Sequence, residues 1–309
     1  MKLLITGATG LIGKNIMAKA QKKNITIHFL STQKNKLIDS DGVKGFYWNP
    51  LKGEIDGRCF EGVDTLIHLA GASISKSWTT KNKKEILDSR VSTSRLLRKE
   101  MKQQNIKMNN ILCASAIGIY PNSFELNFDE KSEIEEKNFL QKVTIAWEKE
   151  SAAMDSFAGH LCVLRIGLVL AKDEGLLSLL TIPFRLFLGT AFASGKQWQS
   201  WIHIEDLSQL FITAANQNWE GTFNAVAPNP VSQRTMMKAI GKVLHSPVFL
   251  PNISGFLIKK VMGERSILIL GSQKVSANLI LSKGFSFQFP FLPEALENIF
   301  KKKEARLSV

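Results

Sequence analysis

Near its beginning the chain reads Thr6-Gly7-Ala8-Thr9-Gly10-Leu11-Ile12-Gly13, between an apolar run and a segment of helical periodicity. Three glycines at this spacing, after a strand and at the start of a helix, are typical of a turn that binds a dinucleotide. Gly7 permits the tight turn, Gly10 lets a pyrophosphate approach the backbone, and Gly13 lets the helix pack closely on the strand. The free amides at the start of the helix then hold the anion.

The first 170 residues continue this alternation of apolar runs and helical patterns. The apolar runs are Leu3–Thr6, Ile25–Leu30, Thr65–Ala70, Ile111–Ser115 and Cys162–Leu170, and the helical segments are Ile12–Lys22, Lys81–Gln103 and Phe139–Met154. Short, fully apolar strands separated by helices are typical of a parallel sheet that is covered on both faces. We therefore predict an α/β fold, a Rossmann-type doubly wound parallel sheet.

Beyond this region the pattern changes. An irregular segment precedes two further strands and a helix, at Ser200–Ile204, Thr222–Val226 and Asp206–Asn216, and after Val231 only short helices are indicated. We expect residues 1–170, completed by about 201–227, to form the dinucleotide-binding Rossmann domain. Residues 171–200 and 228–309 are expected to form a smaller substrate or lid domain, packed on the carboxyl ends of the strands.

Composition places the chain among ordinary globular proteins. It has 309 residues, 44% hydrophobic and 22% charged, which excludes the disordered, collagen-like and coiled-coil classes. Its three cysteines, Cys59, Cys113 and Cys162, are odd in number and far apart, so neither a disulfide framework nor a metal site is expected. The strand-like run Lys2–Ile5 leaves no room for a signal peptide, and we expect a cytoplasmic protein.

Charge and hydropathy bear on the possible partners. The chain carries 40 lysines and arginines against 27 acidic residues, a formal net charge of +13. Because the basic residues are scattered instead of gathered in one stripe, no nucleic-acid partner is expected. The longest apolar stretch, Leu176–Phe192, is interrupted by Pro183 and Arg185 and falls short of the ~20 apolar residues of a membrane span, so no membrane partner is expected. The expected partner is a small-molecule substrate, and monomer and homodimer both stay open.

The end of the second predicted strand bears on the choice of dinucleotide. An NAD site usually has Asp or Glu about 20 residues after the glycine turn, bonded to the ribose hydroxyls. Here the chain reads Leu30-Ser31-Thr32-Gln33-Lys34-Asn35-Lys36, which contains no carboxylate. Hydroxyl and ammonium groups suit the 2′-phosphate of NADP, whereas an acid would repel it. The sequence therefore favours NADP over NAD as the cofactor, although lysines also occur here in ordinary solvated loops.

Several motifs in order resemble those of the extended short-chain dehydrogenase/reductases, the group of nucleotide-sugar epimerases and dehydratases. They are the glycine turn, Asp64 to Gly71, Ser115, Arg165-Ile166-Gly167 and Trp201 to Asp206. A second set is similar to the atypical branch called epimerase family proteins: Trp48-Asn49-Pro50, Ser89-Arg90-Val91, Ala114 to Tyr120, Trp147-Glu148, Pro183 to Leu186, Ser200 to His203, Ala227-Pro228 and Gly271 to Val275. The resemblance covers nearly the whole chain and implies a C-terminal domain of unknown function at about Val231–Phe300.

The resemblance also implies a catalytic pattern from which this chain departs. Active members of the wider group use a Ser or Thr, a Tyr that exchanges the proton at the sugar oxygen, and a Lys four residues after the Tyr. With Ser115 as the serine, the Tyr and the Lys are expected near Leu140 and Thr144, and neither residue has the required chemistry. The candidate catalytic residues are therefore Ser115, to polarise a substrate oxygen, and Tyr120, to handle the proton unless water does so. A structural Tyr120, packed at the strand end, is an equal alternative.

The remaining candidates concern the cofactor. Arg90 follows the third predicted strand and is a candidate clamp for a phosphate, or else half of a surface ion pair. His203, in an apolar strand, is interpreted as structural. The cofactor-binding set comprises Gly7, Thr9, Gly10, Leu11, Ile12, Gly13, Ser31, Thr32, Leu69, Ala70, Gly71 and Arg90.

Two functions fit these residues. The first is an NADP-dependent oxidoreductase or epimerase, in which a hydride passes between the nicotinamide and a carbonyl or alcohol carbon of a small, nucleotide-sugar-like substrate. The second is a dinucleotide-binding sensor or interaction protein with little or no catalysis. The missing Tyr and Lys favour the second function, whereas the glycine turn and the lid domain fit both.

Overall fold

The computed structural model describes residues 1–172 and 174–300, and its centre is one mostly parallel sheet. The strands of this sheet are β1 (Lys2–Thr6), β2 (Thr26–Ser31), β3 (Asp39–Ser40), β4 (Val43–Asn49), β6 (Thr65–His68), β7 (Met108–Ala116), β9 (Ala158–Ile166) and β13 (Gly221–Ala225), and β5 (Glu54–Ile55) pairs with β4. Their spatial order is β13-β9-β7-β6-β1-β2-β4-β3. After β1 the chain thus adds β2 and β4 on one side of β1, and it later adds β6 on the other side. This reversal is the switch point at which doubly wound sheets bind ligands, and the predicted fold class is confirmed.

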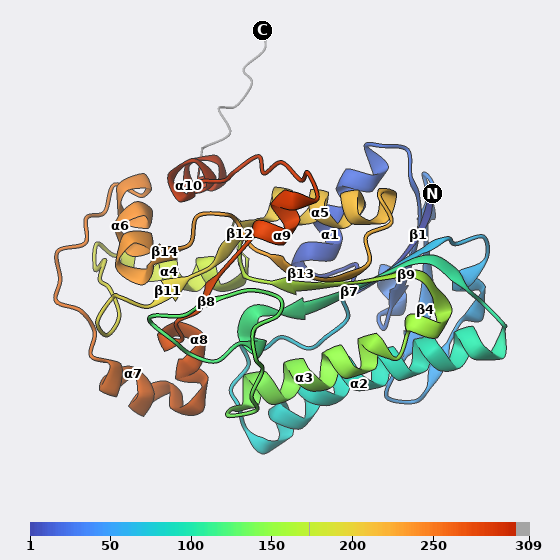
Figure 1. Ribbon diagram of the computed structural model, residues 1–309, viewed down its shortest axis with the longest axis horizontal. Helices are drawn as coiled ribbons and strands as arrows, with labels where there is room; N and C mark the ends of the chain where they lie inside the picture. The colour runs from blue at the N-terminus through green and yellow to red at the C-terminus, as the bar shows by residue number, and fades with distance from the viewer. Residues whose placement is uncertain (173, 301–309) are drawn as a thin grey trace, which may run out of the picture.

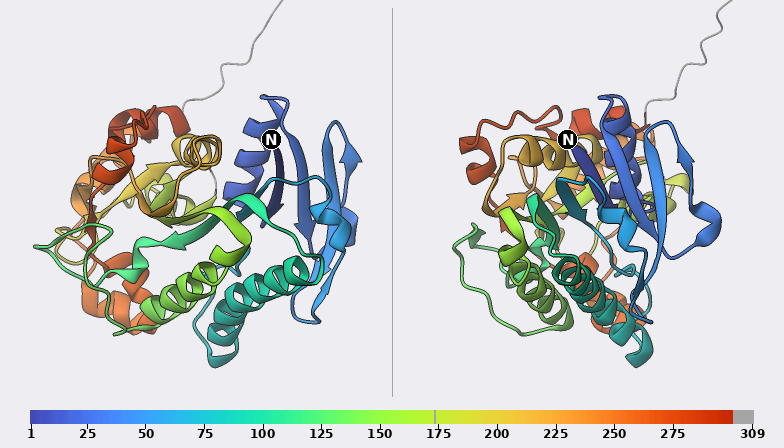
Figure 2. Two further views of the ribbon diagram at one scale, coloured as in Figure 1. Left: turned by 45° about the vertical axis from the view of Figure 1, so that its right-hand side comes forward. Right: turned by 90° about the vertical axis from the view of Figure 1, so that its right-hand side faces the viewer.

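Helices cover both faces of the sheet (Figures 1 and 2). On one face lie α1 (Leu11–Gln21) and α5 (Ile204–Asn216), and on the other lie α2 (Thr80–Gln103) and α3 (Phe139–Ala152). Successive side chains of β1 divide between them, because Leu3 and Ile5 are buried with residues of α1 and α5, whereas Leu4 is buried with residues of α2. Burial on both faces explains why the strands read as continuous apolar runs.

A smaller region lies beside the carboxyl ends of the strands, on the left of Figure 1. It contains β10 (Leu168–Leu170), α4 (Gly175–Arg185), β11 (Trp198–Gln199), β12 (Trp201–His203), β14 (Val231–Ser232), α6 (Gln233–Val243), α7 (Gly255–Met262), α8 (Ile267–Leu270) and α10 (Leu292–Phe300). Nearby, β15 (Lys274–Val275) pairs with β8 (Asn127–Phe128), and α9 (Asn278–Ser282) packs on β13. Single 3₁₀ turns occur at Lys34–Lys36, Gly57–Phe60, Ile117–Ile119, Asp155–Phe157 and Gly263–Ser266.

The core of the smaller region packs α4, α6 and α10 around the buried Trp201. Short helices after Val231 were expected and are found, while residues 301–309 lie outside the described residues. The proposed division of the chain into domains at residues 170, 201 and 228 stays a prediction. None of the helices in the described ranges is long and apolar enough to cross a membrane.

The run Cys162–Leu170 was expected to be one strand and is two. β9 ends at Ile166, and β10 begins at Leu168 and pairs with β12 outside the main sheet. A Cβ on the intervening Gly167 would lie 2.6 Å from the carbonyl oxygen of Ser200, so glycine is required where the chain changes partner.

Two other elements were not anticipated. β4 has no continuous apolar run, because it lies near the edge of the sheet and exposes Lys44. Residues 175–185, expected to be irregular, form α4, since Pro183 falls in its last turn and interrupts few helical hydrogen bonds.

Candidate functional site

A cavity of about 540 Å³ lies at the switch point, between the carboxyl ends of the strands and the smaller region. One wall consists of the glycine turn, the segment after β6 and Arg90 of α2, and the next consists of Ala116 to Gly118 and one face of α3. The smaller region closes the cavity with Gly175, Leu176, Trp198, Gln199, Ser200, Ile267, Leu268, Gly271 and Gln273.

Most of the residues predicted to bind the cofactor are brought together here. Gly7, Gly10, Leu11, Ile12, Gly13, Leu69, Gly71 and Arg90 all line the cavity. Thr9, Ser31, Thr32 and Ala70 lie outside its wall. Ile267 and Leu268 of α8, which complete the cavity, were not found from the sequence, because they carry no spacing signature.

The three positions of the turn hold glycine for different physical reasons. Gly7 has φ +69°, and a Cβ there would lie 3.0 Å from the backbone of Leu69. A Cβ on Gly13 would lie 2.4 Å from the carbonyl oxygen of Gly7, so the helix and the turn require glycine at both places. At Gly10, φ is −84° and the nearest protein atom to an added Cβ is 3.3 Å away. The fold therefore demands Gly7 and Gly13, whereas Gly10 leaves room on the side of the cavity.

The start of α1 directs partial positive charge toward the open space beside Gly10. Gly10 is the residue that precedes the helix, and no side chain caps the helix there. The first turn contains no acidic residue either. An uncapped helix start combines free amides with the positive end of the helix dipole, and this combination suits an anion such as a phosphate.

A chain of buried hydrogen bonds supports the turn from below. The hydroxyl oxygen of Thr6 accepts from the amides of Leu69 and Ala70 at 3.0 and 3.1 Å, and it lies 2.7 Å from Nδ1 of His68. Nε2 of His68 lies 2.9 Å from the hydroxyl of Ser94. Because the Thr6 oxygen already accepts two bonds, its proton goes to Nδ1, and His68 is neutral with its proton on Nε2. Burial lowers the pKa of His68 to about 4, in keeping with the neutral ring.

Arg90 places a guanidinium group in the cavity wall without an acidic partner among the described residues. Its Nη1 donates to the carbonyl oxygens of Ala72 and Ile86 at 3.1 and 2.9 Å, and the group lies 4.8 Å from the centre of the Trp147 ring. Its Nε is buried and makes no hydrogen bond within the described part of the chain. Burial lowers the pKa of Arg90 to about 10. The surface ion pair considered above is not found, and a half-enclosed cation of this kind favours a bound anion.

Ser31 is the last residue of β2 and Thr32 follows it, one and two residues beyond the Thr6–Leu30 pair of the β1–β2 register. Ser31 is buried, and its hydroxyl accepts from the amide of Gln33 at 3.1 Å. Thr32 and Lys34 are exposed, and Nζ of Lys34 lies 4.8 Å from the centre of the Tyr47 ring. The end of β2 therefore presents a hydroxyl, an ammonium group and an aromatic face, outside the wall of the cavity.

Ser115 does not face the cavity. Its side chain is buried, and its hydroxyl donates to the carboxylate of Glu148 at 2.5 Å, which also pairs with Arg165 at 2.9 Å. Side chains alternate along a strand, and the next residue, Ala116, is the one that lines the cavity. The expected catalytic serine position is therefore shifted by one residue, onto a side chain without a polar atom.

Tyr120 is also kept from the cavity. Its hydroxyl donates to Asn224 at 2.7 Å and accepts from Arg165 at 2.9 Å, and the ring stacks on Phe128. Burial raises its pKa. The structural alternative for Tyr120 fits this geometry, and we do not carry Ser115 or Tyr120 forward as catalytic residues.

The two positions at which the resemblance implies Tyr and Lys do lie in the cavity wall. Leu140 and Thr144 are one helical turn apart on α3. The hydroxyl of Thr144 donates to the carbonyl oxygen of Leu140 at 2.8 Å and is thus engaged by its own helix. Arg90 is the one titratable residue among the described residues that line the cavity. The site can hold an anion, but its side chains offer no proton donor of ordinary acidity.

His203 lies outside the cavity wall. Its Nδ1 accepts from the amide of Glu205 at 3.1 Å and so caps α5, and its ring packs on Phe289. This geometry agrees with the interpretation of His203 as structural. The three cysteines are buried and free.

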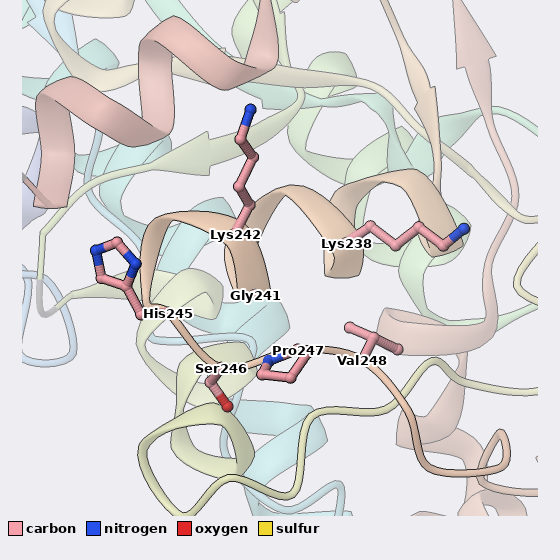
Figure 3. Close-up of a pocket in the computed structure, with 7 residues that line it drawn as sticks. All are labelled: Lys238, Gly241, Lys242, His245, Ser246, Pro247 and Val248. Carbon is pink, nitrogen blue, oxygen red and sulfur yellow. The ribbon is translucent and has the colours of Figure 1, made fainter.

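A second hollow, of about 490 Å³, lies at the end of α6 and is lined by Lys238, Gly241, Lys242, His245, Ser246, Pro247 and Val248 (Figure 3). The side chains of Lys238, Lys242 and His245 project in different directions, and the hydroxyl of Ser246 points away from both lysines. These groups do not converge on one point, so we assign no ligand to this hollow.

Comparison with known proteins agrees with the fold and the glycine turn. Residues 3–225 match the model of the NAD dependent epimerase/dehydratase family, and residues 253–299 match a domain of unknown function, DUF1731. The chain belongs to the NAD dependent epimerase/dehydratase family. Within it, the chain is similar to the epimerase family protein YfhF of Bacillus subtilis, with 30% identity over 305 residues that cover 98% of this chain and 99% of YfhF.

Solved structures give the same result. The crystal structure of the human epimerase family protein SDR39U1 (isoform 2) with NADPH has a TM-score of 0.82 and 26% identity, and covers 97% of this chain and 99% of that chain. MoeE5 in complex with UDP-glucuronic acid and NAD has a TM-score of 0.76 over 97% of this chain and 98% of that chain, and at 16% identity it shows the fold alone. The resemblance to epimerase family proteins is confirmed.

Proposed function

We propose that this protein binds NADP(H) in the cavity at the β1–β6 switch point. The observation that carries the proposal is that the uncapped start of α1 and the unpaired Arg90 guanidinium face the same enclosed space. Two positive centres in one cavity suit the phosphates of a dinucleotide. The NADPH in the similar structure of human SDR39U1 supports the same ligand. A nicotinamide dinucleotide, when bound, supplies or accepts a hydride.

The preference for NADP over NAD rests on the end of β2. Thr32 and Lys34 are exposed there, and no carboxylate lies between Leu30 and Lys36. Trp147 and Trp198 line the cavity, so intrinsic fluorescence reports on binding. We expect NADPH to bind more tightly than NADH in such titrations, and Lys34→Glu to weaken NADPH binding while leaving NADH nearly unchanged. Lys22→Glu, at an exposed lysine after α1, is the matched control. Equal affinities for the two cofactors would refute the preference.

For the reaction, we propose hydride transfer to a small carbonyl compound, or from the corresponding alcohol, with water as the proton source. The side chains that line the cavity exclude bulk water and position the ligand, but Ala116, Leu140 and Thr144 replace the groups that would exchange a proton with a sugar oxygen. This same absence favours a second candidate, a sensor that binds NADPH without turnover. Cofactor binding is common to both.

One pair of assays separates the two candidates. NADPH affinity is measured by fluorescence, and NADPH consumption is then followed with a panel of small aldehydes, ketones and nucleotide sugars. Consumption that depends on one carbonyl compound and is lost in Gly10→Val supports the reductase. Tight binding without consumption supports the sensor. A protein that binds neither cofactor would refute both.

A further inference from the structure

The smaller region exposes large apolar side chains on two segments that lie side by side. The amide of Ala193 donates to the carbonyl oxygen of Ile253 at 2.8 Å, and the amide of Ile253 donates to that of Ala191 at 3.0 Å, so the two segments meet at residues 191–193 and 253. We call the following exposed set the apolar face: Leu186, Phe187 and Leu188 after α4, and Phe249, Phe256, Leu257 and Val261 on or before α7. Phe256 and Val261 are 78% and 76% exposed. Exposed apolar groups gathered in this way mark an interaction surface.

α7 carries the most exposed part of this face. At 100° per residue, Phe256, Lys260, Leu257 and Val261 fall within an arc of about 140°. Ile258, which is buried, lies on the other side of the helix. The outward side of α7 therefore combines three apolar side chains with a lysine, and nothing in the described chain covers it.

The charge around the apolar face is mostly positive, and Glu264, in the turn that follows α7, is paired with Lys83 at 2.7 Å. Residues 221–263 contain no Asp or Glu, and they contain five basic residues, Arg234, Lys238, Lys242, Lys259 and Lys260. Residues 175–204 also contain no acidic residue. Lys259 and Lys260 are exposed and form no ion pair with any residue that the structure describes. In Figure 1, α6, α7 and the loop between them form one margin of the molecule.

We propose that the apolar face docks on the surface of an anionic lipid bilayer. A helix that presents Phe, Leu and Val together with Lys suits the boundary between headgroups and acyl chains, where the apolar groups insert and the lysine stems reach back to the phosphates. Each lysine near an anionic surface adds about 1 kcal/mol of attraction. A second copy of this chain fits less well, because a two-fold contact would set the unpaired lysines of α7 against each other.

This attachment is peripheral, so it needs no spanning helix. The expectation of no membrane partner rested on the length of the apolar stretch Leu176–Phe192 and thus concerned only spanning segments. Part of that stretch, Leu186 to Leu188, belongs to the apolar face. The proposal is independent of the cofactor, because none of the residues of the apolar face lines the cavity.

The test compares two matched double variants of the full chain. Lys260→Gln with Val261→Ser alters the apolar face, and Leu51→Ser with Lys52→Gln alters an equally exposed apolar–lysine pair in the turn between β4 and β5. Co-sedimentation is measured with vesicles of phosphatidylcholine that contain phosphatidylglycerol, and with vesicles of phosphatidylcholine alone. Far-UV circular dichroism and Tm, which these exposed changes should leave unaltered, verify the fold.

The unmodified protein is expected to bind the anionic vesicles and not the neutral ones. The α7 pair should weaken this binding more than fivefold, since one lysine alone accounts for about that factor, and the control pair should weaken it less than twofold. Equal losses in the two pairs would mean general adsorption of a basic protein and would overturn the proposal. If the unmodified protein does not bind the anionic vesicles, the proposal is overturned as well. This includes the case in which the protein is a dimer in solution and the α7 pair of substitutions dissociates it.

Discussion

Replacing Arg90 by methionine should weaken NADPH binding and leave the stability of the ligand-free protein nearly unchanged. Burial lowers the pKa of Arg90 from 12.5 to about 10, which corresponds to roughly 3 kcal/mol of unfavourable burial. Methionine keeps the apolar stem beside Trp147 but loses the two charge-assisted hydrogen bonds to Ala72 and Ile86, at about 1.5 kcal/mol each. The two contributions nearly cancel, so Tm should change by no more than about 2 °C in either direction for a chain of this size.

NADPH binding, in contrast, should change clearly. A charge-assisted contact to a phosphate contributes about 1.5–3 kcal/mol, so loss of the guanidinium should raise the Kd for NADPH roughly 10- to 100-fold. Fluorescence titration gives the Kd, and thermal unfolding with and without NADPH gives the stability of the free and the bound protein.

Arg98→Met is the matched control on the same helix. Arg98 pairs with the buried carboxylate of Glu150 at 2.5 Å and lies outside the cavity, so its loss should lower Tm and leave the Kd unchanged. If Arg90→Met instead lowers Tm and leaves the Kd unchanged, Arg90 is a structural residue and our reasoning about its missing counter-ion is wrong.

Three further predictions concern the turn, the buried histidine and turnover. Gly10→Val should fold normally, as measured by circular dichroism, and should lose NADPH binding, as measured by fluorescence titration. Gly13→Ala should lower Tm, because its Cβ would lie 2.4 Å from the backbone. Normal NADPH binding by Gly10→Val would contradict the assignment of the turn. His68 has a pKa near 4 when folded against 6.5 when unfolded, so its contribution to stability is complete above pH 6.5 and is lost as pH falls toward 4. Between pH 7 and pH 5, the free energy of unfolding measured in urea should therefore fall by about 2 kcal/mol more in the unmodified protein than in His68→Gln. An equal fall in the two proteins would refute this account. With common nucleotide sugars, steady-state turnover should stay below about 1 s⁻¹, because a positioned acid or base contributes about 10²–10⁴-fold. Leu140→Tyr with Thr144→Lys should raise that rate only if the pocket otherwise fits such a sugar, and a fast rate in the unmodified protein would show that another group replaces the pair.

The parts of the site that sequence reasoning found are local in the chain. The glycine turn joins one strand to the next helix, so its spacing alone carries the geometry of Gly7, Gly10 and Gly13. Leu140 and Thr144, the positions at which the resemblance implies Tyr and Lys, both lie in the wall, because residues four apart on a helix share a face.

The sequence alone could not show which way the side chain of Ser115 points. β7 is buried on both faces for most of its length, so its sequence lacks the alternation of apolar and polar residues that would show which side chains face the cavity. A shift of one residue then moves the assignment from one face to the other. The far wall could not be predicted at all, because Ile267, Leu268 and Gln273 reach the cavity only through tertiary packing.

The close contact between Gly7 and Gly13 bears on how a ligand would associate. With the start of α1 pressed against the carbonyl of Gly7 and the hydroxyl of Thr6 held from below, the turn has little freedom to rearrange. The surface that binds the ligand is thus already ordered in the folded protein. A ligand that enters the cavity therefore loses its own conformational, translational and rotational freedom, but the protein loses little. Association rates of different dinucleotides should then be similar, and selectivity among them should reside in how slowly the preferred one dissociates.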